Sequence, residues 1–485
     1  MLRTLITKEL KTIILSPKFT ATFALCSVLM VLSVFVGIRE YRHAVRQYET
    51  ARQLVSEELR QQSDWSGLNN RTYRLPDPMQ IFVTGIGNDL GRWSNLSQLD
   101  PVKLRNSAYS DDPIFAIFRV IDFGFIVQIV LSLFAFLFTY DAINGERESG
   151  TLALVFSNSI PRSRYLAAKL AGSWLGLVVP LLIPVAIGLL LILAYSIPFD
   201  AQHWHQLFSL LFVSVLFFTF FVALGLCISA LTRHSNISFL ICLVAWVLFI
   251  LILPRAGVIA AAQAIPVPTV AEVEAQQDAY AKDRWEEHSK LLEQRFQERQ
   301  KATAGFSKEE RESYENNHLW NWMEEDDAKR KEMQKEIDAH GVILQEDLRN
   351  RKAAQERLAF TFSRFSPASA YQLAVMDIAG TNIDLKSNYE DALRSYRTTF
   401  NDYAQQKQKE SGGRGGIRVT MDSEKGMKIE LPRDRGSLDL TGMPRFEHPR
   451  AAPVFPILDA GILVFAALLA FAGSVAGFLR YDLRC

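Results

Sequence analysis

The sequence predicts an all-α polytopic membrane protein with six transmembrane helices. A large, mainly helical extracytoplasmic insertion separates the fifth and sixth helices, and a smaller one separates the first and second. Three observations lead to this prediction. The 485-residue chain contains six long apolar runs that lack Asp, Glu, Lys and Arg. Its charged residues, 22% of the chain, gather in two long stretches between these runs, and the short connecting loops are basic.

Composition excludes several other classes of protein. Long uncharged apolar runs are incompatible with an ordinary soluble enzyme. The balance of 53 Lys and Arg against 52 Asp and Glu leaves no basic footprint for nucleic acid. No P-loop, H-E-x-x-H or G-x-S-x-G motif is present. His203 and His205 flank Trp204 in a short loop, where interfacial anchoring is favoured over metal binding. We therefore expect no catalytic, cofactor-binding or metal-binding residues in this chain.

The N-terminal segment 1–18 is predicted to be a cytoplasmic interfacial helix. Apolar residues recur at helical spacing from Leu2 to Ile14, and Lys8 and Lys11 flank them. This pattern is typical of an amphipathic helix that lies in the headgroup layer. The alternative is a simple extension of the first membrane helix.

The six apolar runs are predicted to cross the membrane. One charge at the centre of such a helix costs about 2.5–3.5 kcal/mol, and core helices of soluble proteins rarely contain apolar segments of this length. The first run lacks a small-residue cleavage site, so it is interpreted as a mature helix and not as a signal peptide. The uncharged runs are Phe19–Ile38, Phe123–Tyr140, Leu170–Pro198, Leu207–Leu231, Ile237–Leu253 and Ala460–Leu479. With their flanks, the transmembrane helices are assigned to 19–38, 114–140, 170–198, 207–231, 237–258 and 455–479.

The loop charges predict the orientation. The segments on the side of the N-terminus (1–18, 141–169, 232–236 and 480–485) carry eleven Lys or Arg and five Asp or Glu. The segments 39–113 and 259–454 carry ten against ten and 30 against 34. Since short cytoplasmic loops are enriched in Lys and Arg, both termini, including the tail 480–485, should be cytoplasmic. The two large segments should be extracytoplasmic, in an inner (cytoplasmic) membrane.

Both extracytoplasmic segments should contain helices. Segment 39–113 begins as a helical continuation of the first span, to about Gln62, and then becomes irregular. In segment 259–454, two stretches rich in helix formers, 270–301 and 308–365, predict an antiparallel hairpin of long helices. Shorter helices near 367–379 and 386–410 and one β-hairpin around 423–426 follow. Neither segment contains cysteine, so no disulfide holds them.

The loop 141–169 has the most informative pattern. Leu152, Val155 and Phe156 form an apolar stripe at i, i+3 and i+4. Glu146 and Glu148 precede this short helix, where negative charge suits the helix dipole. Further along, Pro161 fits the first turn of the next helix, and Arg162, Arg164 and Lys169 follow it. A short amphipathic helix between two spans is well shaped for a groove on a soluble partner; the alternative is a plain turn at the membrane surface.

The same stretch resembles a known family. The sequence YDAINGERESGTLALVFSNSIPRSRYLAAKLAG (140–172) is similar to the coupling-helix region of type-2 ABC transporter permeases, with an E-x-E/R-x-G-T-L core and a following Pro-Arg pair. Residues 74–86, 111–143 and 362–383 resemble the subgroup with large extracytoplasmic loops, related to gliding-motility and nitrous-oxide-reductase maturation permeases. Gly172-x-x-x-Gly176 and Gly473-x-x-x-Gly477 permit close helix contact, for which packing within the chain is favoured.

The resemblance implies a non-catalytic permease subunit of an ABC transporter. Cytoplasmic ATPase subunits would bind ATP and Mg, a second permease would complete the pathway as a homodimer or sister subunit, and lipids would surround it. An envelope protein is a further candidate partner. The residues implied to form the ATPase-coupling interface are Glu146, Glu148, Gly150, Thr151, Leu152, Val155, Phe156, Pro161, Arg162 and Arg164. One alternative is an ATPase-coupled scaffold or mechanotransmitter that moves no solute. The other is a sensor, which would normally carry a cytoplasmic output domain.

Overall fold

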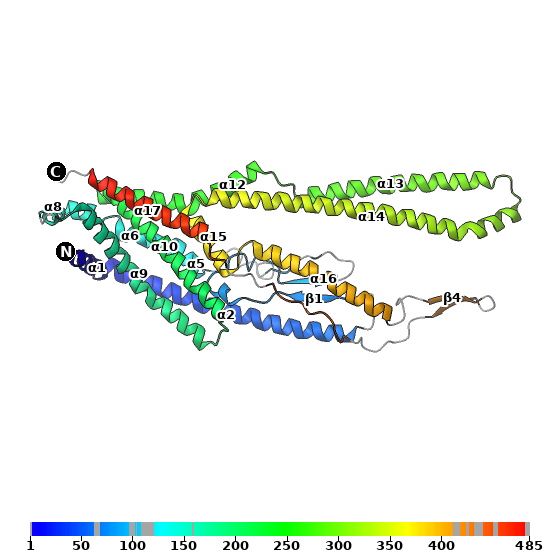
Figure 1. Ribbon diagram of the computed structural model, residues 1–485, viewed down its shortest axis with the longest axis horizontal. Coiled ribbons are helices and arrows are strands. Elements are labelled where there is room, and N and C mark those ends of the chain that lie inside the picture. The colour runs from blue at the N-terminus through cyan, green and yellow to red at the C-terminus, as the bar shows by residue number, and fades with distance from the viewer. Residues whose placement is uncertain are drawn as a thin grey trace. The chain divides into compact units, whose positions relative to one another are not determined.

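The computed structural model describes most of the chain (Figure 1). The chain consists of two compact units. The larger unit contains Met1–Ile252 and Ser366–Cys485, and the smaller contains Leu253–Phe365. The described residues are 2–62, 68–96, 102, 104–107, 121–157, 160–410, 418–422, 426–430, 440–449 and 454–480. The predicted start of the second span, 114–120, and the glycine-rich segment 412–416 lie outside them.

The larger unit is built almost entirely from helices. Its α-helices are α1 (Leu2–Ile14), α2 (Pro17–Gln61), α5 (Phe123–Phe125), α6 (Ser132–Thr139), α7 (Asn144–Glu148), α8 (Thr151–Phe156), α9 (Arg162–Ala194), α10 (Ala201–Leu231), α11 (Ser235–Val247), α15 (Pro367–Ala379), α16 (Asp384–Glu410) and α17 (Ile457–Leu479). The π-helical turns η2 (Ile126–Leu131) and η3 (Leu248–Ile252) extend α5 and α11, and η1 (Pro78–Ile81) is a 3₁₀ turn.

Among the described residues, six helices are long and apolar enough to cross a membrane, which confirms the predicted fold class. They are Pro17–Gln61, Phe123–Glu148, Arg162–Ala194, Ala201–Leu231, Ser235–Ala264 and Ile457–Leu479. The α10 helix is the central one, because 61% of its most apolar window is buried, against 22% for α9 and α17. Large apolar side chains remain exposed on α9, such as Ile183 and Leu190, as expected for helices that face lipid.

Helix α15 packs inside the larger unit. Its small and apolar residues, including Ala370, Tyr371 and Ala374, are completely buried. The Tyr371 hydroxyl is 3.1 Å from the Ser214 hydroxyl of α10, and the Gln206 side chain donates to the Ile378 carbonyl at 2.8 Å. Since Ala side chains allow close helix approach, α15 fits against α10 and α17. The separate unit, Leu253–Phe365, therefore ends just before α15, and the extracytoplasmic location of 259–454 stays a prediction.

A second core lies where α2 continues beyond its apolar part. Val55 and Leu59 of α2 pack with Leu393 and Phe400 of α16 and with Leu96. Leu96 belongs to a three-stranded antiparallel sheet in the order β1-β2-β3, which the sequence did not predict. The strands are β1 (Asn70–Tyr73), β2 (Trp93–Leu96) and β3 (Leu104–Arg105). The predicted β-hairpin is confirmed as β4 (Arg418–Asp422) and β5 (Gly426–Glu430).

The smaller unit is an antiparallel helical hairpin, as predicted. It contains α12 (Leu253–Ala264), α13 (Val270–Ala302) and α14 (Lys308–Ser363). Thr269 and Glu272 form a capping box at the start of α13. The Tyr280 ring stacks on His340 with centroids 3.9 Å apart, and Arg295 pairs with Asp326 at 2.6 Å. Tyr280 precedes Arg295 on α13, whereas its partner His340 follows Asp326 on α14. The two helices are therefore antiparallel, and these contacts define their register.

Candidate functional site

Helices α7 and α8 form the loop that carries the predicted coupling residues. The loop connects α6 to α9 and lies at the same end of the larger unit as the N-terminus and the end of α17 (Figure 1). Gly150 separates the two helices and has a left-handed φ of +73°. Glycine adopts this conformation without steric cost, so its position explains the sharp change of direction between α7 and α8.

A buried ion cluster anchors α7 to two other helices. The Lys169 ammonium of α9 lies 2.7 Å from Glu9 of α1 and 3.0 Å from Glu146 of α7, with its side chain only 5% exposed. Glu146 also accepts from Lys8 at 2.6 Å and from the Tyr165 hydroxyl at 2.6 Å. Two lysines therefore balance two carboxylates. Because charged hydrogen bonds are among the strongest in proteins, the cluster joins the loop firmly to α1 and α9.

Glu146 makes its contacts within the chain. Its side chain is 13% exposed and is occupied within the chain. A carboxylate held by Lys169, Lys8 and Tyr165 positions the loop, and its contact with an ATPase stays a prediction.

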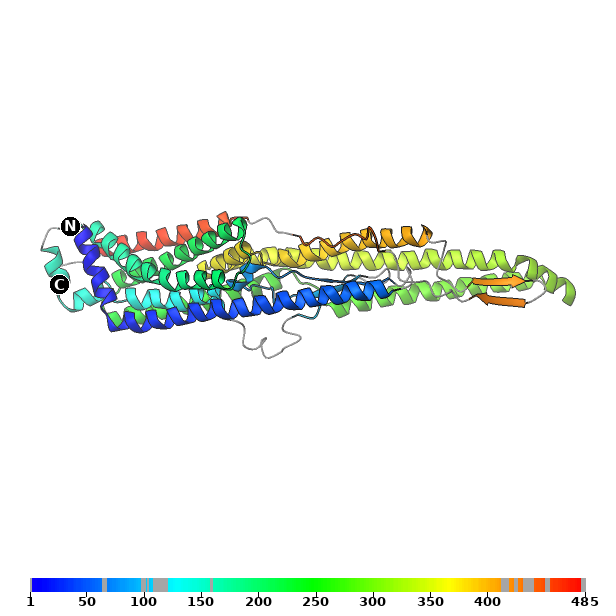
Figure 2. The ribbon, with the colours of Figure 1, turned by 90° about the horizontal axis from the view of Figure 1, so that it is seen from below.

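Helix α1 is a separate helix that packs against α9. The helical conformation is interrupted at Leu15–Ser16. The Ser16 hydroxyl then caps α2 by accepting a 3.2 Å hydrogen bond from the Phe19 amide. Figure 2 shows α1 turned away from the axis of α2. A methyl group at Gly172 would approach the Glu9 Cβ to 2.5 Å, and one at Gly176 would touch Ile13. The two glycines therefore form the groove that receives α1, which confirms packing within the chain as their use.

The apolar stripe of α8 faces the protein's own interior. Leu152 is 4% exposed, and Val155 and Phe156 are partly buried beside it. They pack on a cluster that includes Tyr165 of α9 and Phe478 of α17. The Phe156 ring lies 5.2 Å from Tyr165 and 5.7 Å from Phe478 between centroids. Packing onto α9 and α17 thus buries Leu152 and partly covers Val155 and Phe156 within this chain, and the entry of this stripe into a partner's groove stays a prediction.

Two further predicted residues connect the loop to neighbouring helices. Glu148 accepts from the Ser235 amide at 2.9 Å and from its hydroxyl at 2.7 Å, at the start of α11. Arg162 donates to the carbonyls of Phe478 and Leu479 at 3.2 and 2.7 Å, at the end of α17. A cation at the C-terminal carbonyls of a helix is favoured by the helix dipole. The loop thus touches the ends of α9, α11 and α17 through polar contacts.

The outward side of the loop carries a different set of residues. Leu154 is 69% exposed, and Thr151, Ala153 and Arg164 are exposed as well. Pro161 is exposed and precedes α9 as its N-cap residue. An apolar side chain exposed beside small residues, at the end of a loop, is suited to insertion into a partner's cleft. We call Thr151, Ala153 and Leu154 the α8 outer face.

Sequence reasoning missed several residues of this site. Leu154 was overlooked because the stripe at 152, 155 and 156 already accounted for one helix face. The sequence of α8, TLALVF, carries apolar residues on both faces of the helix. Since a helix at the surface buries only one face, this pattern indicates that the other face holds an exposed apolar residue. Glu9 and Lys169 give no such signal, since their pairing depends on α1 meeting α9 in space.

The described residues do not bring together metal ligands. No group of three His, Cys, Asp or Glu side chains within them lies close enough to hold a metal ion. His203 instead completes a capping box with Asp200 at the start of α10. This capping contact gives a structural role to His203, one of the two histidines that flank Trp204.

Comparison with known proteins identifies the family. The family model described as ABC-2 family transporter protein matches residues 3–402, which include α1, the α7–α8 loop and the first five candidate spans. A search of curated proteins gives no match. The match covers most of the chain, and six apolar helices agree with it. The chain therefore belongs to the ABC-2 family of transporter proteins, whose members are the membrane subunits that work with a cytoplasmic ABC ATPase.

Proposed function

We propose that this chain is the permease subunit that couples ATP hydrolysis by a separate ATPase to substrate movement across the inner membrane. The observation that carries the proposal is the α8 outer face, mounted on a loop that contacts α1, α9, α11 and α17. A force applied to Leu154 would reach four helices through short polar and aromatic contacts. An isolated surface turn would lack this connection.

The coupling step follows from these contacts. Closure of two ATPase subunits would displace α8, whose inner face is packed on α9 and α17. The ion cluster would make α1 and the base of α9 move with α7, because separating its charges in a buried site is costly. Arg162 would carry the same displacement to the end of α17. A shift at these helix ends would alter the pathway between this chain and a second permease.

The orientation belongs to the same proposal. Lys8, Lys169 and Arg162 gather at the end of the larger unit that holds the N-terminus and α8. Since positively charged residues are retained on the cytoplasmic side, this end would face the cytoplasm and the ATPase. The three-stranded sheet and the α13–α14 hairpin would then be extracytoplasmic.

The α8 outer face can be tested by mutation. Leu154→Asp places a charge at the centre of the proposed contact and should weaken association with the ATPase at least tenfold, equivalent to about 1.4 kcal/mol. Co-purification and stimulated ATP hydrolysis would be measured with the ATPase of the same transporter. The matched control is Ile343→Asp, because Ile343 is 63% exposed on α14. If Leu154→Asp leaves ATPase association and stimulated ATP hydrolysis undiminished, the proposal is contradicted.

A second candidate function rests on the smaller unit. Its helix α14 has 56 residues, a length of about 84 Å at 1.5 Å per residue. A long solvated hairpin is suited to transmit force to an envelope protein, so the chain would be a mechanotransmitter that moves no solute. Replacing 270–363 by a short linker separates the two functions. Retained ATP-dependent transport would favour the permease, and loss of an envelope function with full ATP hydrolysis would favour the mechanotransmitter.

A further inference from the structure

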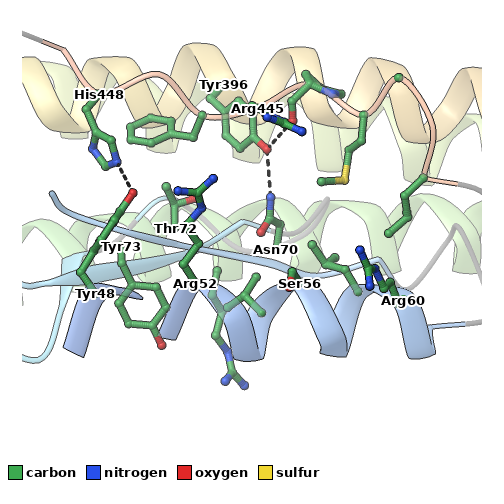
Figure 3. Close-up of a pocket in the computed structure, with 18 of the residues that line it drawn as sticks. Tyr48, Arg52, Ser56, Arg60, Asn70, Thr72, Tyr73, Tyr396, Arg445 and His448 are labelled. Atoms are coloured by element: carbon green, nitrogen blue, oxygen red, sulfur yellow. Dashed lines mark hydrogen bonds between the residues drawn. The ribbon is translucent and has the colours of Figure 1, made fainter. Parts of the chain in front are cut away.

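A cleft lies in the larger unit, away from the α7–α8 loop. The outer half of α2 and strand β1 form one wall, and α16 and the return segment 440–448 form the other (Figure 3). Its volume is about 670 Å³, within the range of about 300–1,000 Å³ that small-molecule sites occupy. All of its lining residues belong to the same unit.

The lining is strongly basic. Arg52 and Arg60 come from α2, Arg71 from β1 and Arg445 from the return segment. None of the described lining residues is Asp or Glu. Arg71 lies 3.6 Å from Glu58, whereas no ion pair to another described residue holds Arg52, Arg60 or Arg445. Guanidinium groups from opposite walls can bind one oxyanion through paired N–H donors.

The lining also offers apolar and aromatic surface. Val55 and Leu59 lie on α2, Tyr396 on α16, and Met443 and Phe446 on the return segment. The Tyr396 and Phe446 rings pack with centroids 5.4 Å apart. An apolar or aromatic body could lie against these side chains while its charged end meets the arginines. The site therefore favours a molecule with both features over a simple inorganic ion.

The walls are held in place by buried polar contacts. Asn70 is 6% exposed and donates to the Tyr396 hydroxyl at 2.9 Å, and Tyr396 donates to the Pro444 carbonyl at 2.9 Å. The Tyr48 hydroxyl lies 3.2 Å from the His448 ring (Figure 3). These bonds connect the return segment to β1 and α2. The cleft is thus a formed site, and it need not be assembled by its ligand.

One wall residue has an unused hydrogen-bonding group. Thr72 is 6% exposed, and its Oγ1 has no hydrogen-bond partner in the described part of the chain. Buried hydroxyl groups normally have a partner. At His448, burial and the nearby Arg52 lower the pKa to about 4, so this ring is neutral near pH 7. The positive charge of the cleft therefore comes from arginines alone.

We propose that this cleft binds a soluble small molecule that carries a phosphate or carboxylate on an apolar or aromatic body. A membrane lipid fits less well. The residues 48–60 on α2 lie 10–22 positions beyond Ile38, where the apolar run ends, which places them about 15–33 Å along the helix. Most of the cleft is therefore beyond the headgroup layer. The proposal is independent of ATPase coupling and concerns a site distant from α8.

The test uses the full chain in phosphatidylcholine nanodiscs without an ATPase. 1-Naphthyl phosphate is the probe, and calorimetry measures its binding. 1-Naphthol and inorganic phosphate test the body and the anion separately. We expect naphthyl phosphate to bind at least tenfold more tightly than either fragment. Failure of naphthyl phosphate to bind at millimolar concentration, or equal binding of naphthol, overturns the proposal.

Variants locate the binding site. The double variant Arg52→Gln with Arg445→Gln should weaken binding at least tenfold, while Arg46→Gln, an exposed position on α2 outside the lining, should leave it unchanged. The three side chains that are changed, Arg52, Arg445 and Arg46, are solvent-exposed charges, and thermal unfolding of each variant checks folding. Equal affinity in a folded double variant overturns the proposal. The last measurement repeats the binding of naphthyl phosphate in nanodiscs that contain phosphatidylglycerol. If this lipid competes with naphthyl phosphate, the cleft binds lipid headgroups and the proposal is overturned.

Discussion

Lys169 is the central residue of the buried ion cluster that holds the α7–α8 loop. Its ammonium satisfies two carboxylates from helices that are far apart in sequence, and water reaches only 5% of its side chain. The basic start of the third span first suggests a lysine that faces the membrane surface. Burial instead makes it a structural cation, whose removal leaves Glu9 and Glu146 without their shared partner.

Lys169→Met should destabilise the protein by about 3–5 kcal/mol, the usual cost of breaking a buried ion pair. The physical reason is the uncompensated negative charge near Glu9 and Glu146. Thermal unfolding in nanodiscs measures the effect, with Lys11→Met on the exposed side of α1 as the control. Adding Glu9→Gln and Glu146→Gln should restore much of the loss. An unchanged unfolding temperature in Lys169→Met would mean that the cluster contributes nothing.

At the scale of elements, α1 and α9 meet through glycine. A side chain at Gly172 has no space because the Glu9 Cβ lies 2.5 Å from the position of the added atom. Small residues allow this kind of close helix approach. The contact also places Glu9 beside Lys169, so the glycine groove and the ion cluster are parts of one arrangement.

Gly172→Val should displace α1 from α9, since overpacking costs about 1–3 kcal/mol and the backbone of α1 must move. Limited proteolysis with trypsin, which cleaves after Lys8, Lys11 and Lys18, would report the release as faster cleavage. The matched control is Gly461→Val in α17, where an added Cβ meets no described atom within 4 Å. Equal cleavage rates for the two variants would contradict the groove.

The α13–α14 hairpin is the second element with a clear expectation. A fragment of residues 266–365 should be soluble and predominantly helical by circular dichroism, because its ion pairs and capping box lie within it. A longer fragment, 265–410, should aggregate, since it exposes the apolar residues of α15 that are buried in the larger unit. A random-coil spectrum for 266–365 would show that the hairpin needs the rest of the chain.

For the whole molecule, the orientation can be checked with single cysteines. In a background without the four native cysteines, Gln300→Cys and Thr420→Cys should react with a membrane-impermeant thiol reagent in intact cells, and Ser149→Cys should not. Ser149 is preferable to Gly150, whose positive φ disfavours a side chain. Labelling at 149 but not at 300 would reverse the orientation.

Local sequence was sufficient for the membrane helices and the helical hairpin. Hydropathy and helix propensity are properties of neighbouring residues, so the six apolar helices and α13–α14 could be predicted from composition and periodicity. The motif around Gly150 also located the loop. In contrast, the three-stranded sheet consists of strands of two to four residues, which are too short to give a periodic signal.

By itself, the sequence determined that this chain is an all-α membrane protein, where its apolar helices lie and which loop carries the family motif. Only the tertiary structure decided which way side chains point. It turned Leu152 inward and Leu154 outward, buried Glu146 against Lys169, and drew α15 into the larger unit. The physical reason is that burial and ion pairing depend on helices that meet in space, such as α1 with α9 or α8 with α17. A local sequence pattern does not show which helices will contact one another.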